Sequence, residues 1–202
     1  MNDYQPSAKE VKALRDRTGA GMMDCKAALL ESGGEIEQAT DLLRIKGAAD
    51  AAKRSGREAR EGIIDSYIHT GGRVGVLVEV NCETDFVARS DDFTTFVHDV
   101  ALHIAAMNPQ FVSADEVSDD YKARERAVYL AQAEDVDEKF RDKAVEGKLA
   151  KHLKEVALLD QEFIRDQTEK KARTIGELRA EVASRLGENV TIRRFVRYEL
   201  GG

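Results

Sequence analysis

Residues 79–89, EVNCETDFVAR, decide how this fold is built, because a strand pattern changes within them to a helix pattern. Upstream, valines stand at every second position from 74 to 80, which predicts one face of a strand. Downstream, the apolar positions of residues 91–107 recur with helical spacing. Residues 84–87, Thr-Asp-Phe-Val, therefore form a strand-to-helix junction, which we call the elbow.

The elbow has two interpretations that the residues leave open. In the first, Thr84 or Asp85 caps the next helix through its side-chain oxygen, while Phe86 and Val87 enter the core. In the second, the junction presents its polar pair and the following aromatic at the surface, where they contact a partner.

The motif EVNCETDFVAR resembles that of the elongation factor Ts family, the bacterial and organellar nucleotide-exchange partners of elongation factor Tu. A second stretch, residues 14–29 (LRDRTGAGMMDCKAAL), resembles the family's other motif and lies near the N-terminus as expected. It departs from the family pattern at Ala27, where many relatives carry a polar or basic residue, whereas Lys26 is present. Two long motifs in the right order predict a short bacterial member of this family.

The first 55 residues predict three short helices. Ser7 to Glu10 form a capping-box pattern, which opens a helix that ends near residues 18–19. Residues 22–32 form a second helix, and a third is predicted to stop near Gly47, followed by a linker over residues 48–62. The resemblance implies that residues 1–55 are a ubiquitin-associated-like (UBA-like) domain.

Residues 56–202 predict a mixed core. Paired glycines at 71–72 accept the positive φ of a tight turn, so the flanking segments read as a β-hairpin. The remaining predicted elements are a helix over 91–107, an exposed antiparallel helical pair over 119–133 and 137–152 within an insertion at about 118–155, a helix from 174 to 186 and a strand over 190–200. The predicted fold class is α+β: a three-helix bundle, then a core with a small antiparallel sheet and the helical pair.

One copy of the hairpin-and-helix core unit is visible, whereas longer family members carry two. A half core leaves sheet edges and apolar faces unpaired, which is costly unless another chain covers them. We therefore expect a homodimer, with residues 56–202 as the dimerisation domain.

Composition argues against several classes of protein function. The net charge of −7 argues against a protein that grips phosphate backbones, so we expect no direct nucleic-acid binding. No run of eighteen apolar residues and no signal peptide pattern is found, so we expect a cytoplasmic protein without membrane contact. Cys25 and Cys82 have no metal-ligand spacing and are predicted to be small buried hydrophobes.

No enzyme motif is found. The sequence has no GxxxxGK[ST] phosphate loop, no HExxH and no GxSxG, and its four histidines do not fall at helical ligand spacing. We therefore expect no catalytic residues, no cofactor and no metal site.

The resemblance implies a nucleotide-exchange mechanism. The elbow would intrude into elongation factor Tu in its GDP form, with Phe86 as an apolar wedge and Asp85 as a polar lever on the magnesium side. Thr84 and Val87 would hold the elbow, and GDP release would let GTP rebind.

Further contacts with elongation factor Tu are implied for Met22, Met23, Lys26, His69 and Arg89. The two methionines could instead belong to the bundle core. A different class of function also stays open, a noncatalytic interaction module whose bundle binds ubiquitin-like or nascent-chain partners and which would not need the elbow.

Overall fold

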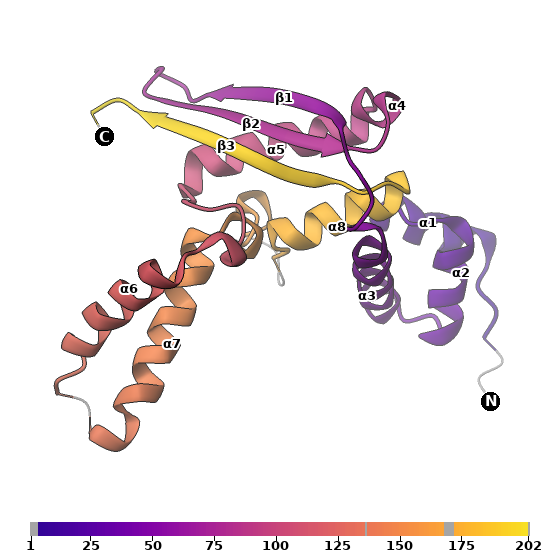
Figure 1. The fold of residues 1–202 in the computed structure, drawn as a ribbon. Coiled ribbons are helices and arrows are strands. Elements are labelled where there is room, and N and C mark those ends of the chain that lie inside the picture. The colour runs from indigo at the N-terminus through magenta and orange to yellow at the C-terminus, as the bar shows by residue number, and fades with distance from the viewer. Residues whose placement is uncertain (1–3, 136, 168–171, 202) are drawn as a thin grey trace. The chain divides into compact units, whose positions relative to one another are not determined.

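We describe the protein from a computed structural model, which describes residues 4–135, 137–167 and 172–201. The α-helices and strands are, in chain order, α1 Ala8–Thr18, α2 Met22–Glu31, α3 Ile36–Arg54, β1 Glu61–Ile68, β2 Val74–Cys82, α4 Asp85–Ala88, α5 Asp91–Met107, α6 Asp119–Ala131, α7 Glu138–Val156, α8 Ile175–Leu186 and β3 Thr191–Glu199. Helices combine with one three-stranded sheet, so the predicted α+β class is confirmed (Figure 1).

The chain divides into two compact units. The bundle unit comprises Met1–Ile63, Val80–Phe96 and Glu177–Thr191, and the sheet unit comprises Ile64–Glu79, Val97–Gly176 and Ile192–Gly202. Each unit is assembled from segments far apart in the sequence. The boundary expected at residue 55 stays a prediction.

Helices α1 to α3 form the predicted three-helix bundle. The capping box that opens α1 is confirmed: the Ser7 hydroxyl accepts from the Glu10 amide, and the Ser7 amide donates to the Glu10 carboxylate at 2.7 Å. The bundle has an apolar core made of Val11, Leu14, Cys25, Ala28, Leu29, Ala39 and Leu43. The prediction that Cys25 is a small buried hydrophobe is confirmed, because it lies in this core.

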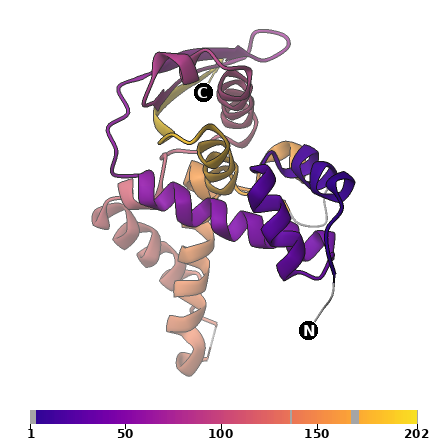
Figure 2. The same cartoon turned by 90° about the vertical axis from the view of Figure 1, so that its right-hand side faces the viewer.

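The predicted end of the third helix near Gly47 is wrong, because α3 continues to Arg54. Gly47 is buried, and a methyl group there would lie 3.6 Å from the Ser184 Cβ, an ordinary van der Waals distance, so this glycine packs against α8. The alanines that follow are strong helix formers and carry the helix onward. Much of the predicted linker over residues 48–62 is therefore helical, and Figure 2 shows α3 extending past α1 and α2.

Helix α8 is attached to the bundle by side chains of α3. Arg44 donates to the Glu177 carboxylate at 2.7 Å. Near the other end of α8, Arg185 pairs with Asp92 at 3.3 Å. These contacts hold α8 in the bundle unit, and the loop that follows it reaches the elbow, as described below.

The predicted hairpin forms β1 and β2, and β3 pairs with β2 in the order β1-β2-β3. The His69 amide donates to the Val74 carbonyl at 2.9 Å, and Gly71 and Gly72 take φ values of 91° and 69°, as the turn requires. Val76 and Val78 are buried on one face of β2, which confirms the predicted alternation. Figure 1 shows the second half of α5 running along the sheet.

Helices α6 and α7 lie side by side as the predicted antiparallel pair (Figure 1). Arg126 of α6 donates to Glu146 of α7 at 2.7 Å, and the Tyr121 hydroxyl lies 2.9 Å from His152 Nε2. Helix α7 ends at Val156, four residues beyond the predicted end. Among the described residues, no helix combines the length and the apolar character that a membrane crossing needs.

Candidate functional site

Most of the elbow lies in a single helical turn, α4, which is separated from the end of β2 by two residues. Thr84 is its N-cap: its hydroxyl oxygen accepts from the Val87 amide at 3.3 Å, and its carbonyl accepts from the Ala88 amide at 3.1 Å. Thr84 therefore caps a helix through its side-chain oxygen, but that helix is the short α4, which was not predicted, and not the predicted helix over residues 91–107.

The expectation that Phe86 enters the core is wrong, because 81% of this residue is exposed. A helix of one turn has little inward surface, and α4 uses it to bury Ala88 while Val87 is half-buried. Exposure of a large aromatic on a capped turn favours the surface interpretation of the elbow.

Asp85 is engaged within the elbow. Its carboxylate accepts from Arg89 at 2.8 Å, an i,i+4 ion pair between two solvent-exposed side chains. The sequence analysis gave Asp85 and Arg89 separate roles, but in the structure they form one ion pair beside Phe86. Exposed pairs of this kind contribute little to stability, so a partner's charges can replace either member.

Loop residues after α8 also belong to the site, and sequence reasoning missed them. The Glu188 carboxylate accepts from the amides of Glu83 and Thr84 at 2.9 and 3.0 Å. Asn189 donates its amide to the Glu83 carboxylate at 2.6 Å. More than a hundred positions separate the partners, and no local pattern signals such a pairing.

Helix α2 presents a second exposed surface, the α2 surface, made of Met22, Met23 and Lys26. The methionines are 44% and 74% exposed, so the alternative that they belong to the bundle core is wrong. The helix buries Cys25, Ala28 and Leu29 instead. Met22 and Lys26 are one turn apart and share a face of the helix, which places an apolar and a basic group together.

His69 lies elsewhere, in the hairpin turn of the sheet unit. It is exposed, and its Nδ1 is 3.1 Å from the Tyr67 hydroxyl. The elbow, Arg89 and the α2 surface all belong to the bundle unit, so the structure assigns these predicted residues to one compact unit and His69 to the other.

Two buried titratable groups have shifted pKa values, Cys82 next to the elbow and His103 in the sheet unit. Burial raises the pKa of the Cys82 thiol to about 11, and the carboxylate of Glu188 adds to the shift. Burial also lowers the pKa of His103, which lies 2.9 Å from Gln161 Oε1. Among the residues that the structure describes, no group of His, Cys, Asp and Glu is placed to hold a metal ion. Exposed apolar side chains on anchored short helices are typical of a surface that binds another protein.

Comparison with known proteins agrees with a protein that binds another protein. The family model described as Elongation factor TS matches residues 39–202. Elongation factor Ts of Thermoanaerobacter sp. (strain X514) is 52% identical, over 96% of this chain and 95% of the relative. The protein of the same name from Syntrophomonas wolfei is 53% identical, over 96% of this chain and 90% of the relative. The chain belongs to the elongation factor Ts family, which places it among the translation elongation factors.

Proposed function

We propose that this protein is a guanine nucleotide exchange factor for elongation factor Tu. It binds the GDP form, promotes GDP release by disturbing the magnesium and phosphate site, and allows GTP to rebind, without making or breaking covalent bonds. Membership of the family supports the partner. The observation that carries the mechanism is Phe86, which is 81% exposed on a capped turn in the middle of the motif.

The elbow supplies a wedge and a lever. A GTPase holds the phosphates through backbone donors and through a magnesium ion that demands near-octahedral geometry, so small displacements there weaken GDP binding strongly. Phe86 enters as the apolar wedge, and burial in the partner recovers the hydrophobic free energy that it forgoes in the free protein. Asp85 leaves Arg89 to act on the magnesium side, and Thr84 and Val87 hold the turn.

The α2 surface docks the factor on its partner. Methionine side chains adapt to irregular apolar surfaces, and Lys26 is suited to an acidic one. His69 and Arg89 add polar contacts. Thermodynamic linkage then sets a condition. If this protein lowers the affinity of elongation factor Tu for GDP by some ratio, GDP must lower the affinity of elongation factor Tu for this protein by the same ratio. The factor therefore speeds exchange and leaves the final nucleotide balance to the nucleotide concentrations.

The test is the release rate of a fluorescent GDP analogue from elongation factor Tu in the presence of magnesium. The unmodified protein should accelerate release, and Phe86→Ala should lose about 30-fold or more of that acceleration, the effect of a typical interface hot spot. Phe140→Ala is the matched control, because Phe140 is also an exposed phenylalanine on a helix, at 62%. No acceleration by the unmodified protein would exclude the exchange function; equal rates for both variants would exclude the wedge.

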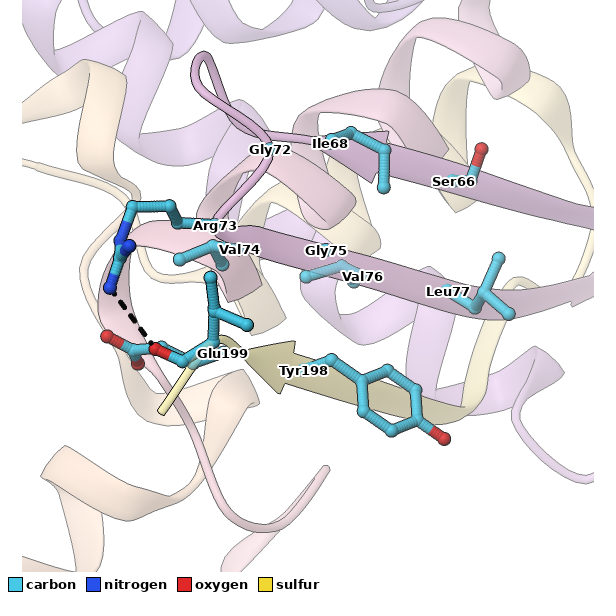
Figure 3. A pocket seen from close by; sticks show the side chains of 11 residues that line it. Ser66, Ile68, Gly72, Arg73, Val74, Gly75, Val76, Leu77, Tyr198 and Glu199 are labelled. Carbon is cyan, nitrogen blue, oxygen red and sulfur yellow. Dashed lines mark hydrogen bonds between the residues drawn. The ribbon is translucent and has the colours of Figure 1, made fainter. Parts of the chain in front are cut away.

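We also infer a homodimer formed through the outer face of the sheet. Ile68 of β1, Leu77 of β2 and Tyr198 of β3 are exposed and line an open apolar cavity on neighbouring strands (Figure 3). An exposed apolar patch of this kind is costly in a monomer, and a two-fold axis lets the same patch cover itself.

Light scattering tests the dimer at micromolar concentration. The unmodified protein should have twice the mass of the chain, and Leu77→Asp should reduce it to one chain, because a charge would be buried at the interface. A single-chain mass for the unmodified protein would overturn the homodimer.

We also place the protein in the cytoplasm, because we propose that it acts on elongation factor Tu.

A further inference from the structure

We propose that Glu188 is a positioning residue, which holds the elbow in the orientation that exchange requires. The inference rests on the proposed exchange function and deepens it. Glu188 lies in the loop between α8 and β3, outside both sequence motifs, and it is half-buried.

The Glu188 carboxylate accepts three hydrogen bonds from residues at the start of the elbow. Glu188 Oε2 accepts from the Glu83 amide at 2.9 Å and the Thr84 amide at 3.0 Å, while Oε1 accepts from the Thr84 hydroxyl at 2.6 Å. Charged hydrogen bonds of this kind are shorter and stronger than neutral ones. Together they fix both the backbone and the side chain of Thr84.

The Thr84 hydroxyl passes this restraint into α4. It has one proton, which it donates to Glu188, and its oxygen accepts from the Val87 amide at 3.3 Å. The carboxylate therefore selects the hydroxyl orientation in which the oxygen is free to cap the turn. Phe86 lies between the capping residue and Val87, so its direction depends on this chain of hydrogen bonds.

Neighbouring contacts anchor Glu188 itself. Asn189 is buried and donates its side-chain amide to the carbonyls of Arg57 at 2.8 Å and Ser55 at 3.4 Å, while its backbone amide donates to Glu83. Helix α8, which precedes the loop, is tied to α3 by Arg44 and Glu177. The elbow is thus held by the loop after α8, which is itself anchored to residues 55–57, and these segments all belong to the bundle unit.

The role differs from that of a residue needed only for folding. The three donors lie in partly buried or exposed positions, so water can replace the carboxylate when it is removed. The fold should survive that loss, but α4 would no longer be held in one orientation, and precise placement is what a wedge needs.

The experiment compares Glu188→Ala and Glu188→Gln with the unmodified protein in release of the fluorescent GDP analogue. Glu188→Ala should lower the maximal release rate about tenfold, because three charged hydrogen bonds are lost and water replaces part of what they supplied. The concentration for half-maximal effect should change less than about twofold, because the α2 surface is intact. Glu188→Gln retains acceptor oxygen and should fall between the two. Glu58→Ala is the control, since it removes the same charge from an exposed glutamate paired with Arg60.

Amide hydrogen exchange gives a readout that needs no partner. The amides of Glu83 and Thr84 should lose protection in Glu188→Ala, while those of α1 to α3 keep theirs. A normal maximal rate in both Glu188 variants, with active unmodified protein, would overturn the positioning role and leave the exchange function standing. Unchanged protection of the two amides would also overturn it. Inactive unmodified protein would instead exclude the proposed exchange function.

Discussion

Helices α4 and α5 follow one another in the chain and begin with the same local chemistry, yet they place their phenylalanines in opposite environments. The Thr84 hydroxyl accepts from the amide three residues on, that of Val87, and the Ser90 hydroxyl accepts from that of Phe93 at 3.4 Å. Phe86 is 81% exposed, whereas Phe93 is fully buried. A cap therefore determines where a helix starts, and does not determine what its side chains contact.

The difference follows from length and surroundings. Helix α5 has seventeen residues and a continuous apolar stripe, so its first turn is drawn into a core with the rest. Helix α4 has four residues, buries Ala88 and leaves Phe86 outside. Burial of a phenylalanine is worth about 1.5–3 kcal/mol, so an exposed one held on a braced turn is better explained by a partner than by the fold.

The largest expected effect separates the two phenylalanines by stability. Phe93→Ala should lower the free energy of unfolding by about 3–5 kcal/mol, because it leaves a cavity in a packed core. Phe86→Ala should change it by less than about 0.5 kcal/mol. Urea denaturation measures both, and a comparable loss in the two variants would remove the contrast between α4 and α5.

A smaller effect concerns His103, further along α5. Burial lowers the pKa of His103 in the folded protein. As the pH falls below about 6.5, the unfolded chain therefore binds a proton at His103 before the folded protein does. The contribution of His103 to stability should therefore be present above that pH and be lost as the pH falls. Urea titrations at several pH values should show a steeper acid loss for the unmodified protein than for His103→Gln. Equal slopes would mean that the pKa of His103 is the same in the folded and the unfolded protein, so that burial does not shift it.

The two caps offer a finer comparison. Ser90→Ala should cost about 1 kcal/mol of global stability, as is usual for the loss of a helix cap. Thr84→Ala should cost less than about 0.5 kcal/mol globally, because α4 contributes little to a core. Its effect should instead be local, as faster hydrogen exchange at the Val87 amide. The comparison would fail if Thr84→Ala destabilised the protein as much as Ser90→Ala.

The smallest effect belongs to the ion pair of the elbow. Arg89→Gln breaks an exposed contact with Asp85 and should change the free energy of unfolding by less than about 0.5 kcal/mol. Thermal unfolding at low and high salt measures this change. A loss above about 1 kcal/mol would show that the pair supports the fold and is not held ready for a partner.

The sequence by itself determined the elements and the family, because these depend on short-range patterns. The Ser7 capping box, the glycine turn at 71–72 and the valine alternation of β2 all act between near neighbours, and each is seen in the structure. The motifs EVNCETDFVAR and LRDRTGAGMMDCKAAL were sufficient to identify the family to which the chain belongs.

Only the tertiary structure decided what each side chain contacts. It placed Gly47 of α3 against Ser184, and it left Phe86 and the methionines of α2 at the surface. It also joined Glu188 to Thr84 across 104 positions. The physical reason is that burial and long-range hydrogen bonds depend on which distant segments meet, whereas caps, turns and periodicity depend on the residues beside them.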